Sequence, residues 1–450
     1  MRHTRILLVL LSLMFWDINT EAQIQSGSLL WSYQAPSMVL GCPAIAPDGT
    51  IYLGTSSGLC AITNAGSNKW TFPATQSYYS SPAIASDGTI YWGDANANVF
   101  AINPDGSQKW KVSVPGNYST SPAIATDGTV YFVASGILYA FSPAGLKLWQ
   151  FANGAGSVTT GPLSPVIGPD GVIYIGSGNQ TFYAINRDGS LRWQLRTYGP
   201  CGDAAALGRD GVIYFTGNVL VSASANGTQN WYEQTEPFTG SSPAVGPDGT
   251  IYIADAQYHS LYAVDPGGKK IWQSAYGPSG IGFPTTVPAI AGDGMIYYSS
   301  SNSVFAISQQ GAIQWIFGSP FTNSPPTKPT GVSPAIGPDG TVYAAFGDVL
   351  YALKGGTNGL ATAPWPMYRQ NLRHTGRVEN PSLAPPKKRA DANFDIQLAG
   401  EIGQQYSVES TSNFLNWIFV TNFVATSLPM TISDLTATNK AARFYRATTP

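Results

Sequence analysis

Residues 81–110 read SPAIASDGTIYWGDANANVFAINPDGSQKW. An Asp-Gly pair begins at Asp87, Tyr91 follows that Asp by four residues, and Trp110 ends the unit. Pro at the start of a strand, Asp-Gly in a hairpin turn and short apolar runs between turns are typical of antiparallel β-strands. The unit therefore predicts four short strands, with the Trp on the last one.

This unit occurs eight times between residues 31 and 353. The Asp of the Asp-Gly pair recurs at intervals of 38 to 46 residues, at Asp48, Asp87, Asp127, Asp170, Asp210, Asp248, Asp293 and Asp339. A Tyr follows each of them by four residues, at Tyr52, Tyr91, Tyr131, Tyr174, Tyr214, Tyr252, Tyr297 and Tyr343. A Trp precedes each unit, at Trp31, Trp70, Trp110, Trp149, Trp193, Trp231, Trp272 and Trp315.

The repeat predicts the architecture. Its central strands are apolar on both faces, so both faces must be covered. Radial stacking of four-stranded blades supplies that cover, and about 40 residues per blade is the period of a propeller. The sequence predicts an all-β chain with an eight-bladed β-propeller of four-stranded antiparallel blades over residues 23–353, in which the eight Trp dock the blades.

The two ends of the repeat predict how the ring closes. Trp31 has no unit before it, and the last unit ends at Leu353 without a Trp in the expected place. We expect residues 28–33 to form the outer strand of blade eight, because this leaves no exposed edge at the seam. Trp365 is the rival for that position, but it lies farther from the last unit than the spacing in the other blades allows.

The composition disfavours several classes of function for such a propeller. Charged residues make up 11% of the 450 residues and the formal net charge is −2, so we expect no nucleic-acid partner. The chain has only three His and three Cys, which leaves few ligands or bases for metal-dependent or triad chemistry. Most acidic residues of the propeller are turn Asp, whose structural role is sufficient without catalysis.

The N-terminus predicts export. Arg2 and Arg5 make a basic start before the apolar run 6–16, and residues 20–22 offer a cleavage site. That run is shorter than the ~20 residues of a membrane-spanning helix, and no later run is longer. We interpret residues 1–22 as a secretory signal peptide. The mature chain is then expected in the periplasm, at the cell surface or secreted, as a monomer without a transmembrane segment.

Segments such as 101–110, AINPDGSQKW, and 261–272, LYAVDPGGKKIW, resemble the tryptophan-docking repeat of the PQQ-like β-propeller superfamily. The resemblance covers about 320 of the 450 residues. In one branch, the quinoprotein alcohol dehydrogenases hold pyrroloquinoline quinone (PQQ) and calcium in the propeller axis. In another, the propeller subunit of the outer-membrane β-barrel assembly machinery is a non-enzymatic protein-binding scaffold. A fold alone does not choose between such branches.

The residues favour the non-enzymatic branch. The dehydrogenases commonly carry two adjacent cysteines over the cofactor, whereas Cys42, Cys60 and Cys201 are isolated. The short repeat also leaves no room for the long insertions that build an active-site chamber. We therefore assign no catalytic, cofactor or metal residue and expect no cofactor. A PQQ- and calcium-dependent oxidoreductase is one alternative, and a carbohydrate-binding or carbohydrate-active protein is another.

One short motif resembles the start of a calcium-binding loop. It is Asp94-x-Asn96-x-Asn98, but Val99 stands where an EF-hand loop needs Gly. Turn chemistry between the second and third strands of the blade explains these residues at least as well. We prefer the turn interpretation.

The loops that vary between blades are the candidate binding surface. From each Trp to the start of the next unit the chain takes 12 residues in five cases, 16 before blades four and seven, and 19 before blade eight. These outer-to-inner connections all emerge on one face of a propeller, and loops on a rigid scaffold are where binding residues concentrate. Their aromatic residues are the candidate contacts with a ligand: Tyr78, Tyr79, Tyr118, Phe238, Phe283 and Phe321. Tyr198 and Tyr276 lie in the same loops.

Two interpretations of these aromatics stay open. A surface of aromatic anchors with few charges suits a protein or a glycan partner. The alternative is that each ring caps the core of its own blade. Blade five also departs from the repeat, because Ala204-Ala205 replace Ser-Pro. A small-ligand site on the axis or simple drift of the repeat would account for that change.

The composition changes after the ring. Residues 354–390 are rich in Gly, Pro and basic side chains, and we interpret 365–376, WPMYRQNLRHTG, as a strap packed on the ring and 381–389 as a linker. Residues 391–450 alternate apolar and polar positions, and 403–413 resembles a C-terminal β-sandwich module of exported bacterial proteins. Attachment, ligand binding and passive stabilisation are all open roles for it. As a whole, the sequence predicts an exported, non-enzymatic scaffold that binds through its outer-to-inner loop face.

Overall fold

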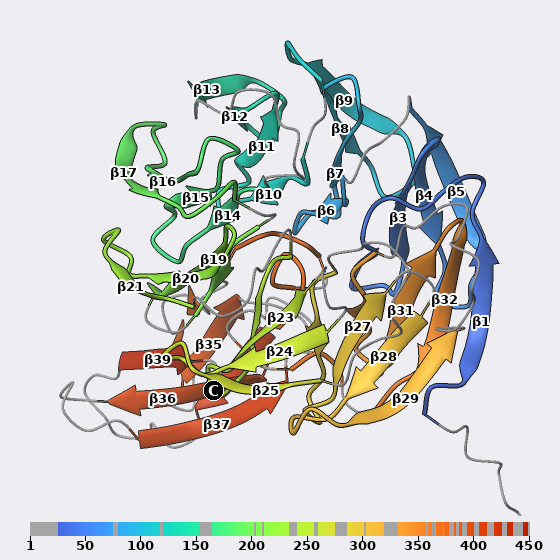
Figure 1. The fold of residues 1–450 in the computed structure, drawn as a ribbon. Coiled ribbons are helices and arrows are strands. Elements are labelled where there is room, and N and C mark those ends of the chain that lie inside the picture. The colour runs from blue at the N-terminus through green and yellow to red at the C-terminus, as the bar shows by residue number, and fades with distance from the viewer. Residues whose placement is uncertain are drawn as a thin grey trace, which may run out of the picture.

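The computed structural model confirms an all-β chain with eight four-stranded antiparallel blades around one axis and a small C-terminal module (Figure 1). The structure describes residues 26–74, 80–117, 120–152, 164–201, 204–208, 211–233, 241–255, 260–274, 286–300, 303–318, 332–356, 359–361, 363, 366–371, 373–377, 382–383, 387–388, 394–399, 405–411, 418–424, 430–434 and 444–448. The predicted signal peptide lies outside them. Within these ranges, no helix is long and apolar enough to cross a membrane.

Each blade has four strands, named A to D from the axis outward. Strand A is β2 (Ala44–Ile45), β6 (Ala83–Ile84), β10 (Ala123–Ile124), β14 (Val166–Ile167), β18 (Ala206–Leu207), β22 (Ala244–Val245), β26 (Ala289–Ile290) or β30 (Ala335–Ile336). Strand B is β3 (Ile51–Thr55), β7 (Ile90–Gly93), β11 (Val130–Ala134), β15 (Ile173–Ile175), β19 (Ile213–Thr216), β23 (Ile251–Asp255), β27 (Ile296–Ser300) or β31 (Thr341–Phe346). Strand C is β4 (Gly58–Ile62), β8 (Asn98–Ile102), β12 (Ile137–Phe141), β16 (Thr181–Ile185), β20 (Leu220–Ala223), β24 (Ser260–Val264), β28 (Ser303–Ile307) or β32 (Val349–Lys354). Strand D is β5 (Asn68–Pro73), β9 (Gln108–Ser113), β13 (Lys147–Ala152), β17 (Leu191–Arg196), β21 (Gln229–Tyr232), β25 (Lys270–Gln273), β29 (Ile313–Gly318) or β1 (Leu29–Gln34).

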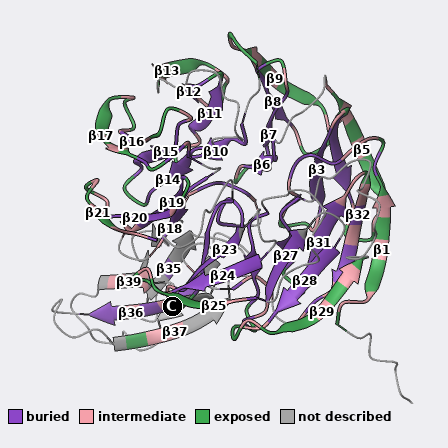
Figure 2. Ribbon diagram, in the orientation of Figure 1, coloured by how far each residue is buried: buried purple, intermediate pink, exposed green. Residues whose placement is uncertain are grey.

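Burial follows the order of the strands. Strands A to C are almost wholly buried, whereas most D strands alternate between exposed and half-buried positions (Figure 2). The Tyr of each repeat packs against the Trp of its own blade, as Tyr52 does against Trp70 with ring centroids 5.7 Å apart. Tyr91 and Trp110 repeat the contact at 5.6 Å in the next blade. The spacing of Asp, Tyr and Trp therefore places one aromatic pair in every blade.

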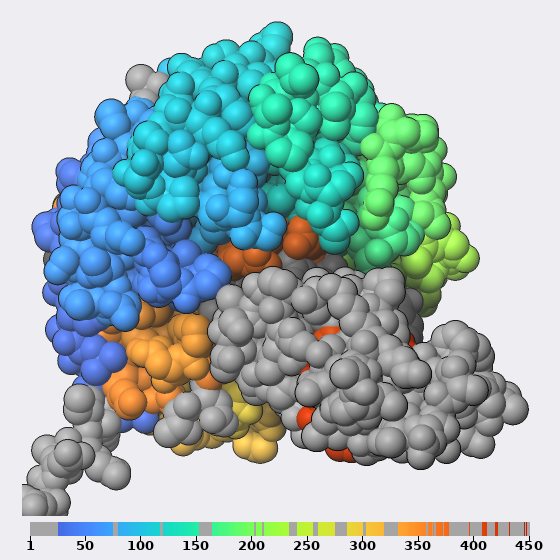
Figure 3. Space-filling view, turned by 180° about the vertical axis from the view of Figure 1, so that it is seen from behind, coloured from blue at the N-terminus to red at the C-terminus, as the bar shows by residue number. Residues whose placement is uncertain are grey.

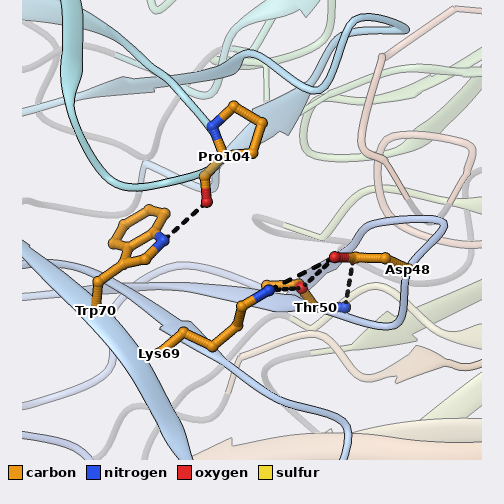
Figure 4. Close-up of polar contacts among 5 residues, drawn as sticks. All are labelled: Asp48, Thr50, Lys69, Trp70 and Pro104. Atoms are coloured by element: carbon orange, nitrogen blue, oxygen red, sulfur yellow. Dashed lines mark hydrogen bonds and ion pairs between the residues drawn. The ribbon is translucent and has the colours of Figure 1, made fainter.

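The predicted Trp residues lie at the interfaces between blades. The Trp70 indole N–H donates to the Pro104 carbonyl of the next blade at 2.9 Å (Figure 4). Its ring covers Gly106, which has φ +88°, and a Cβ added there would lie 2.8 Å from the indole. Only glycine combines that backbone with so close an approach. The same indole-to-carbonyl bond is made by Trp31, Trp110, Trp149, Trp193, Trp231 and Trp272.

The N-terminal strand closes the ring. β1 pairs antiparallel with β32, with Trp31 opposite Ala352, so the sheet order of blade eight is β1-β32-β31-β30. Trp315 of blade seven packs on Gly27, directly before β1, as the other Trp rings pack on later glycines. The outer strand of blade eight therefore comes from the N-terminal residues, as the position of Trp31 predicts. Its rival, Trp365, lies outside the described residues.

The segment interpreted as a strap runs inside the ring. We call residues 359–377 the strap; in Figure 3 dark orange atoms of this part of the chain are visible at the centre of the ring, between the blades. Strand A amides of four blades donate to its backbone: Ile84 to Arg373, Ile124 to Thr375, Ile167 to Gly376 and Ile290 to Pro366. The sequence predicted packing on the ring, whereas the structure places the strap against the innermost strands, where it reaches the axis.

The C-terminal module contains two small sheets. One joins β33 (Ser382–Leu383), β34 (Lys387–Lys388), β35 (Phe394–Ala399) and β38 (Met430–Asp434). The other joins β36 (Gln405–Thr411), β37 (Ile418–Val424) and β39 (Phe444–Thr448). Ile396, Val408 and Ile432 are buried, as expected of a sandwich core. β33 and β34 both pair with β35, so part of the stretch interpreted as linker belongs to this sheet.

Candidate functional site

The candidate site is the face where strand D of one blade connects to strand A of the next, here called the D–A face. The opposite face carries the A–B and C–D turns and is called the turn face. All six aromatic candidates of the D–A face lie outside the described residues: Tyr78, Tyr79, Tyr118, Phe238, Phe283 and Phe321. Their role in binding stays a prediction.

Buried hydroxyl groups form the floor of the D–A face. Ser81 Oγ accepts the Cys42 amide at 2.8 Å, and Ser121 Oγ accepts the Ser81 amide at 2.9 Å. Ser333 Oγ accepts the Val287 amide at 2.8 Å. Each bond joins two neighbouring blades, so the Ser of the Ser-Pro element links three pairs of blades close to the axis. The D–A loops therefore start from a rigid base.

This ring of hydroxyls is interrupted. Blade five has Ala204 in place of the Ser and makes no such bond. The equivalent Ser164 Oγ and Ser242 Oγ, in the blades on either side of it, are buried without a hydrogen-bond partner. Cys42 and Val287 also replace this Ser in blades one and seven, so the departure that the sequence shows in blade five is one of three.

Tyr198 is the one aromatic of these loops that falls within the described ranges. Its side chain is 46% exposed, and its ring stacks on Tyr232 with centroids 4.4 Å apart. Gln229 Nε2 donates to the Tyr198 hydroxyl at 3.3 Å. Both contacts come from β21 of blade five, so Tyr198 does not cap the core of its own blade four. At this position the structure supports the interpretation of an exposed aromatic anchor.

The motif that resembles a calcium loop is a closed turn. Asp94 is buried, and its Oδ1 accepts the amides of Asn96 and Asn98 at 2.9 and 3.0 Å. Its Oδ2 accepts Asn98 Nδ2 at 2.7 Å, and Asn98 in turn accepts Ser113 Oγ. The carboxylate is thus directed into its own hairpin, which agrees with the turn interpretation.

Arg369 anchors the strap on the axis. Its guanidinium is fully buried and donates to the carbonyl oxygens of Pro122 and Pro165, in blades three and four. Gly376 leaves the space for it, because a Cβ at that position would lie 2.5 Å from Arg369 Nη2. One side chain therefore joins two blades that the strap backbone also touches.

His374 makes the second polar anchor. Its Nδ1 lies 3.2 Å from the Pro82 carbonyl of blade two, and since a carbonyl only accepts, Nδ1 carries the proton. Nε2 is then a buried acceptor without a hydrogen-bond partner. Burial, and then the nearby Arg369 charge, lower the pKa of His374 to about 3, so the imidazole is neutral at physiological pH. Tyr368 packs on its edge and also reaches Ser121 Oγ at 2.9 Å.

In the part of the strap that the structure describes, backbone bonds to strand A reach four of the eight blades. In the described residues, no strap carbonyl accepts the equivalent amides of blades one, five, six and eight, which belong to Ile45, Leu207, Val245 and Ile336. Apolar contacts reach the eighth and first blades instead, where Met367 joins the core that holds Ile45 and Ile336. The described part of the strap thus contacts the blades in different ways, through backbone hydrogen bonds in some and through apolar side chains in others.

PQQ does not fit the described part of the axis. The cofactor needs an open chamber there, and the buried Tyr368, Arg369 and His374 occupy that space with contacts to blades two, three and four. The three cysteines are separate free thiols, so no adjacent pair covers a cofactor. Among the described residues, no three His, Cys, Asp or Glu are grouped to hold a metal.

The fold defines a Trp-docked, eight-bladed β-propeller whose axis is closed by its own strap. The family model described as outer membrane protein assembly factor BamB matches residues 20–136, 64–212, 134–275 and 216–362. The chain therefore belongs to this family of PQQ-like repeat propellers, as the sequence predicted.

Solved structures share the fold at low sequence identity. BamB from Moraxella catarrhalis aligns with a TM-score of 0.58 and 15% identity, over 73% of this chain and 97% of that one. The computationally designed protein Ika8 aligns with a TM-score of 0.58 and 12% identity, over 73% of this chain and 100% of that one. No curated protein matches the sequence. These likenesses show the fold alone.

Proposed function

We propose that this chain is an exported, non-enzymatic scaffold that binds a protein partner through its D–A face. The observation that carries the proposal is Tyr198, a half-exposed ring held on Tyr232 in the D–A connection between blades four and five. Tyr is a frequent anchor in interfaces because it buries a large apolar ring and keeps a polar hydroxyl at its edge. The description of the family as an outer membrane protein assembly factor supports a protein partner.

The rest of the ring suits a passive support. Hydroxyl links join blades around the axis, and Trp contacts join them at the periphery. The strap fills the place where the enzymatic branch of the superfamily holds its cofactor. A rigid ring that presents loops of unequal length on one face is the arrangement in which loops determine binding.

Site-specific crosslinking tests the binding face. The photoreactive residue p-benzoylphenylalanine replaces Tyr198 on the D–A face or, as a control, Leu146, which is 68% exposed at a turn-face C–D turn. We expect a discrete crosslinked protein from position 198 in cells of the source organism and none from position 146. Equal crosslinking from both positions, or from neither, would count against the D–A face.

Export needs its own test. We expect residues 1–22 fused to alkaline phosphatase to give an active, exported enzyme, because this enzyme needs an oxidising compartment for its disulfides. A fusion to residues 26–60 is the matched control and should stay inactive. An inactive fusion to residues 1–22 would remove export from the proposal and leave the binding face untouched.

A thermal-unfolding titration tests the enzymatic alternative. A ligand that binds only the folded chain adds about 2.7 kcal/mol at a hundredfold excess over its dissociation constant, which is a readable shift. We expect PQQ with calcium to give no shift. A saturable rise that EDTA abolishes would contradict the scaffold proposal.

The stacked tyrosines also favour a second candidate, a glycan. The exposed ring of Tyr198, with the Gln229 amide beside it, can pack on a sugar face and bond its hydroxyls. Calorimetric titration with oligosaccharides of the source organism's envelope, repeated on the Tyr198→Ala variant, tests this candidate: heat of binding that the variant loses would support a glycan over a protein partner.

A further inference from the structure

The outer edges of the blades differ in charge. Each D strand ends its sheet, so among the described residues one edge of the strand has no β partner. Five of these strands carry Lys or Arg, as β9 does with Lys109 and Lys111 and β17 with Arg192 and Arg196. Charged side chains on an edge strand oppose pairing with another chain. β1, β21 and β29 contain no charged residue.

Two of the uncharged strands are neighbours. β29 of blade seven and β1 of blade eight meet at the seam, where Trp315 packs on Gly27, and Figure 1 shows both strands on the outer rim. We call these two strands the seam edge. β21 is shorter, with four residues, and Glu233 follows it directly.

The seam edge is also apolar. Leu29 and Leu30 on β1 are 47% and 37% exposed, and Ile313 and Ile316 on β29 are 36% and 39% exposed. In blade two, Lys109 and Lys111 flank Trp110, at the positions that Leu30 and Ser32 take beside Trp31. A long, uncharged edge with exposed aliphatic side chains is a template for strand pairing.

The sequence of β29 is compatible with pairing to its own copy. In an antiparallel pair about a two-fold axis, Ile316 would face Ile316 of the second copy, Trp315 would face Phe317, and Gln314 would face Gly318, so each pair shares one face of the sheet and no charges oppose each other. The same pairing of β9 would set Lys111 of one chain opposite Lys111 of the other, and like charges across strands destabilise. Two-fold pairing uses the same strand on both chains and closes after two copies.

We propose that the seam edge is a homodimer interface, in which β29 pairs antiparallel with β29 of a second copy and Leu29 and Leu30 pack beside the pair. The two blades then form one continuous eight-stranded sheet. The proposal departs from the monomer that the sequence analysis expects. Because the edge points outward from the ring, the D–A faces of both copies stay free, and a dimer offers two of them to a partner.

Sedimentation velocity of the full chain tests the proposal. We expect a species of twice the 47.7 kDa chain mass that grows with protein concentration. Ile316→Lys places a charge on the paired edge and should raise the dimer dissociation constant at least tenfold. Leu30→Lys, on the neighbouring strand, should weaken the dimer less. Gln194→Lys is the matched control, because Gln194 follows Trp193 on β17 as Ile316 follows Trp315 on β29.

Three results would overturn the dimer. One is a single-chain mass at every concentration up to about 100 μM. Another is a dimer that Ile316→Lys and Leu30→Lys leave unchanged, which would place the interface elsewhere. The third is equal weakening by Gln194→Lys, which would indicate a general effect of charge. Thermal midpoints within a degree of the parent chain confirm that the variants are folded, since all three positions are exposed.

Discussion

The interfaces between blades and the axis of the ring are held in opposite ways. At the periphery one contact, a Trp ring on a left-handed glycine with an indole-to-carbonyl bond, recurs from blade to blade. On the axis the described part of the strap accepts the strand A amides of four blades, and none of its described carbonyls accepts those of the other four. The described residues show seven copies of this contact, so losing one leaves six. A contact made once has no substitute, so single changes on the axis should cost more.

The largest effect is expected from Arg369→Ala. The change leaves the buried carbonyls of Pro122 and Pro165 without their charged donor, and bonds of this kind contribute about 1.5 to 3 kcal/mol each. We expect a loss of about 3 kcal/mol in chemical denaturation. The peripheral control is Trp149→Phe, which removes one of the repeated indole bonds and should cost about 1 kcal/mol. Equal losses of stability in the two variants would contradict the expectation that a single change on the axis costs more than one at the periphery.

The pH dependence of stability should come largely from His374. The unfolded imidazole takes up a proton near pH 6.5, whereas burial and the Arg369 charge hold its folded pKa at about 3. Between these values the unfolded state binds more protons, so stability falls as the pH falls, by about 1.4 kcal/mol per unit. We expect a loss of about 2.3 kcal/mol from pH 6.5 to 4.5, because the unfolded imidazole is already half protonated at pH 6.5. His374→Asn, which tolerates the left-handed backbone and does not titrate, should flatten this part of the curve; an unchanged slope would contradict the assignment.

A pair of glycine substitutions separates docking from backbone strain. Gly145 and Gly347 have φ values of +82° and +59°, so Ala is strained at both. A Cβ at Gly145 would lie 2.9 Å from the Trp110 ring, whereas nothing lies within 4 Å of one at Gly347. We expect thermal unfolding to report a loss of about 2 kcal/mol for Gly145→Ala and about 1 kcal/mol for Gly347→Ala. Identical losses would mean that the close Trp packing adds nothing.

The smallest effect is expected from Lys69→Met. Lys69 Nζ lies 3.5 Å from Asp48 Oδ2 and donates to Thr50 Oγ1 at 2.8 Å (Figure 4). Burial alone raises the pKa of Asp48, but the bonds from Thr50 and the Lys69 charge outweigh it and lower the pKa overall. Both side chains are more than a third exposed, so screening limits the loss to about 0.5 kcal/mol.

The size of the Lys69→Met effect depends on pH. Because the folded pKa of Asp48 is lowered, its contribution is present above the unfolded value near 3.9 and is lost as the pH falls through the folded pKa. The difference between Lys69→Met and the parent should therefore disappear once the pH lies below the lowered pKa of Asp48, and it should shrink in high salt. A difference that persists in strong acid would point to lost packing of the Lys stem.

The peripheral ring could be predicted from the sequence because its determinants repeat. The recurring Asp-Gly, Tyr and Trp fix the number of blades, and the unpaired Trp31 at one end fixes how the ring closes. Asp94 was correctly interpreted as a turn residue, because its neighbours Asn96 and Asn98 satisfy it locally. Contacts within one hairpin or between equivalent positions leave a signal that a single sequence can show.

The contacts on the axis have no comparable repeated pattern in the sequence. Arg369 lies in a basic stretch, where a solvated side chain is the usual interpretation, yet it is fully buried. Its partners, Pro122 and Pro165, come from blades more than 200 residues earlier in the chain, and neither offers more than a backbone carbonyl. The Tyr198 stack is similar, because only the packing of blade five against blade four brings Tyr232 beneath it. Single-copy contacts between distant segments have no periodicity to reveal them.

The pairing of β1 with β32 also sets the order in which the chain can fold. Trp31 finds its place opposite Ala352 only after the whole propeller sequence has been synthesised or translocated. Until then the nascent chain is an open arc with two unpaired ends, and pairing of such distant segments is slow because loop closure must precede it. A chain stalled before residue 349 would expose both ends to proteases and to other chains. Ring closure therefore requires a chain that extends through β32, because a shorter chain leaves β1 without its partner strand.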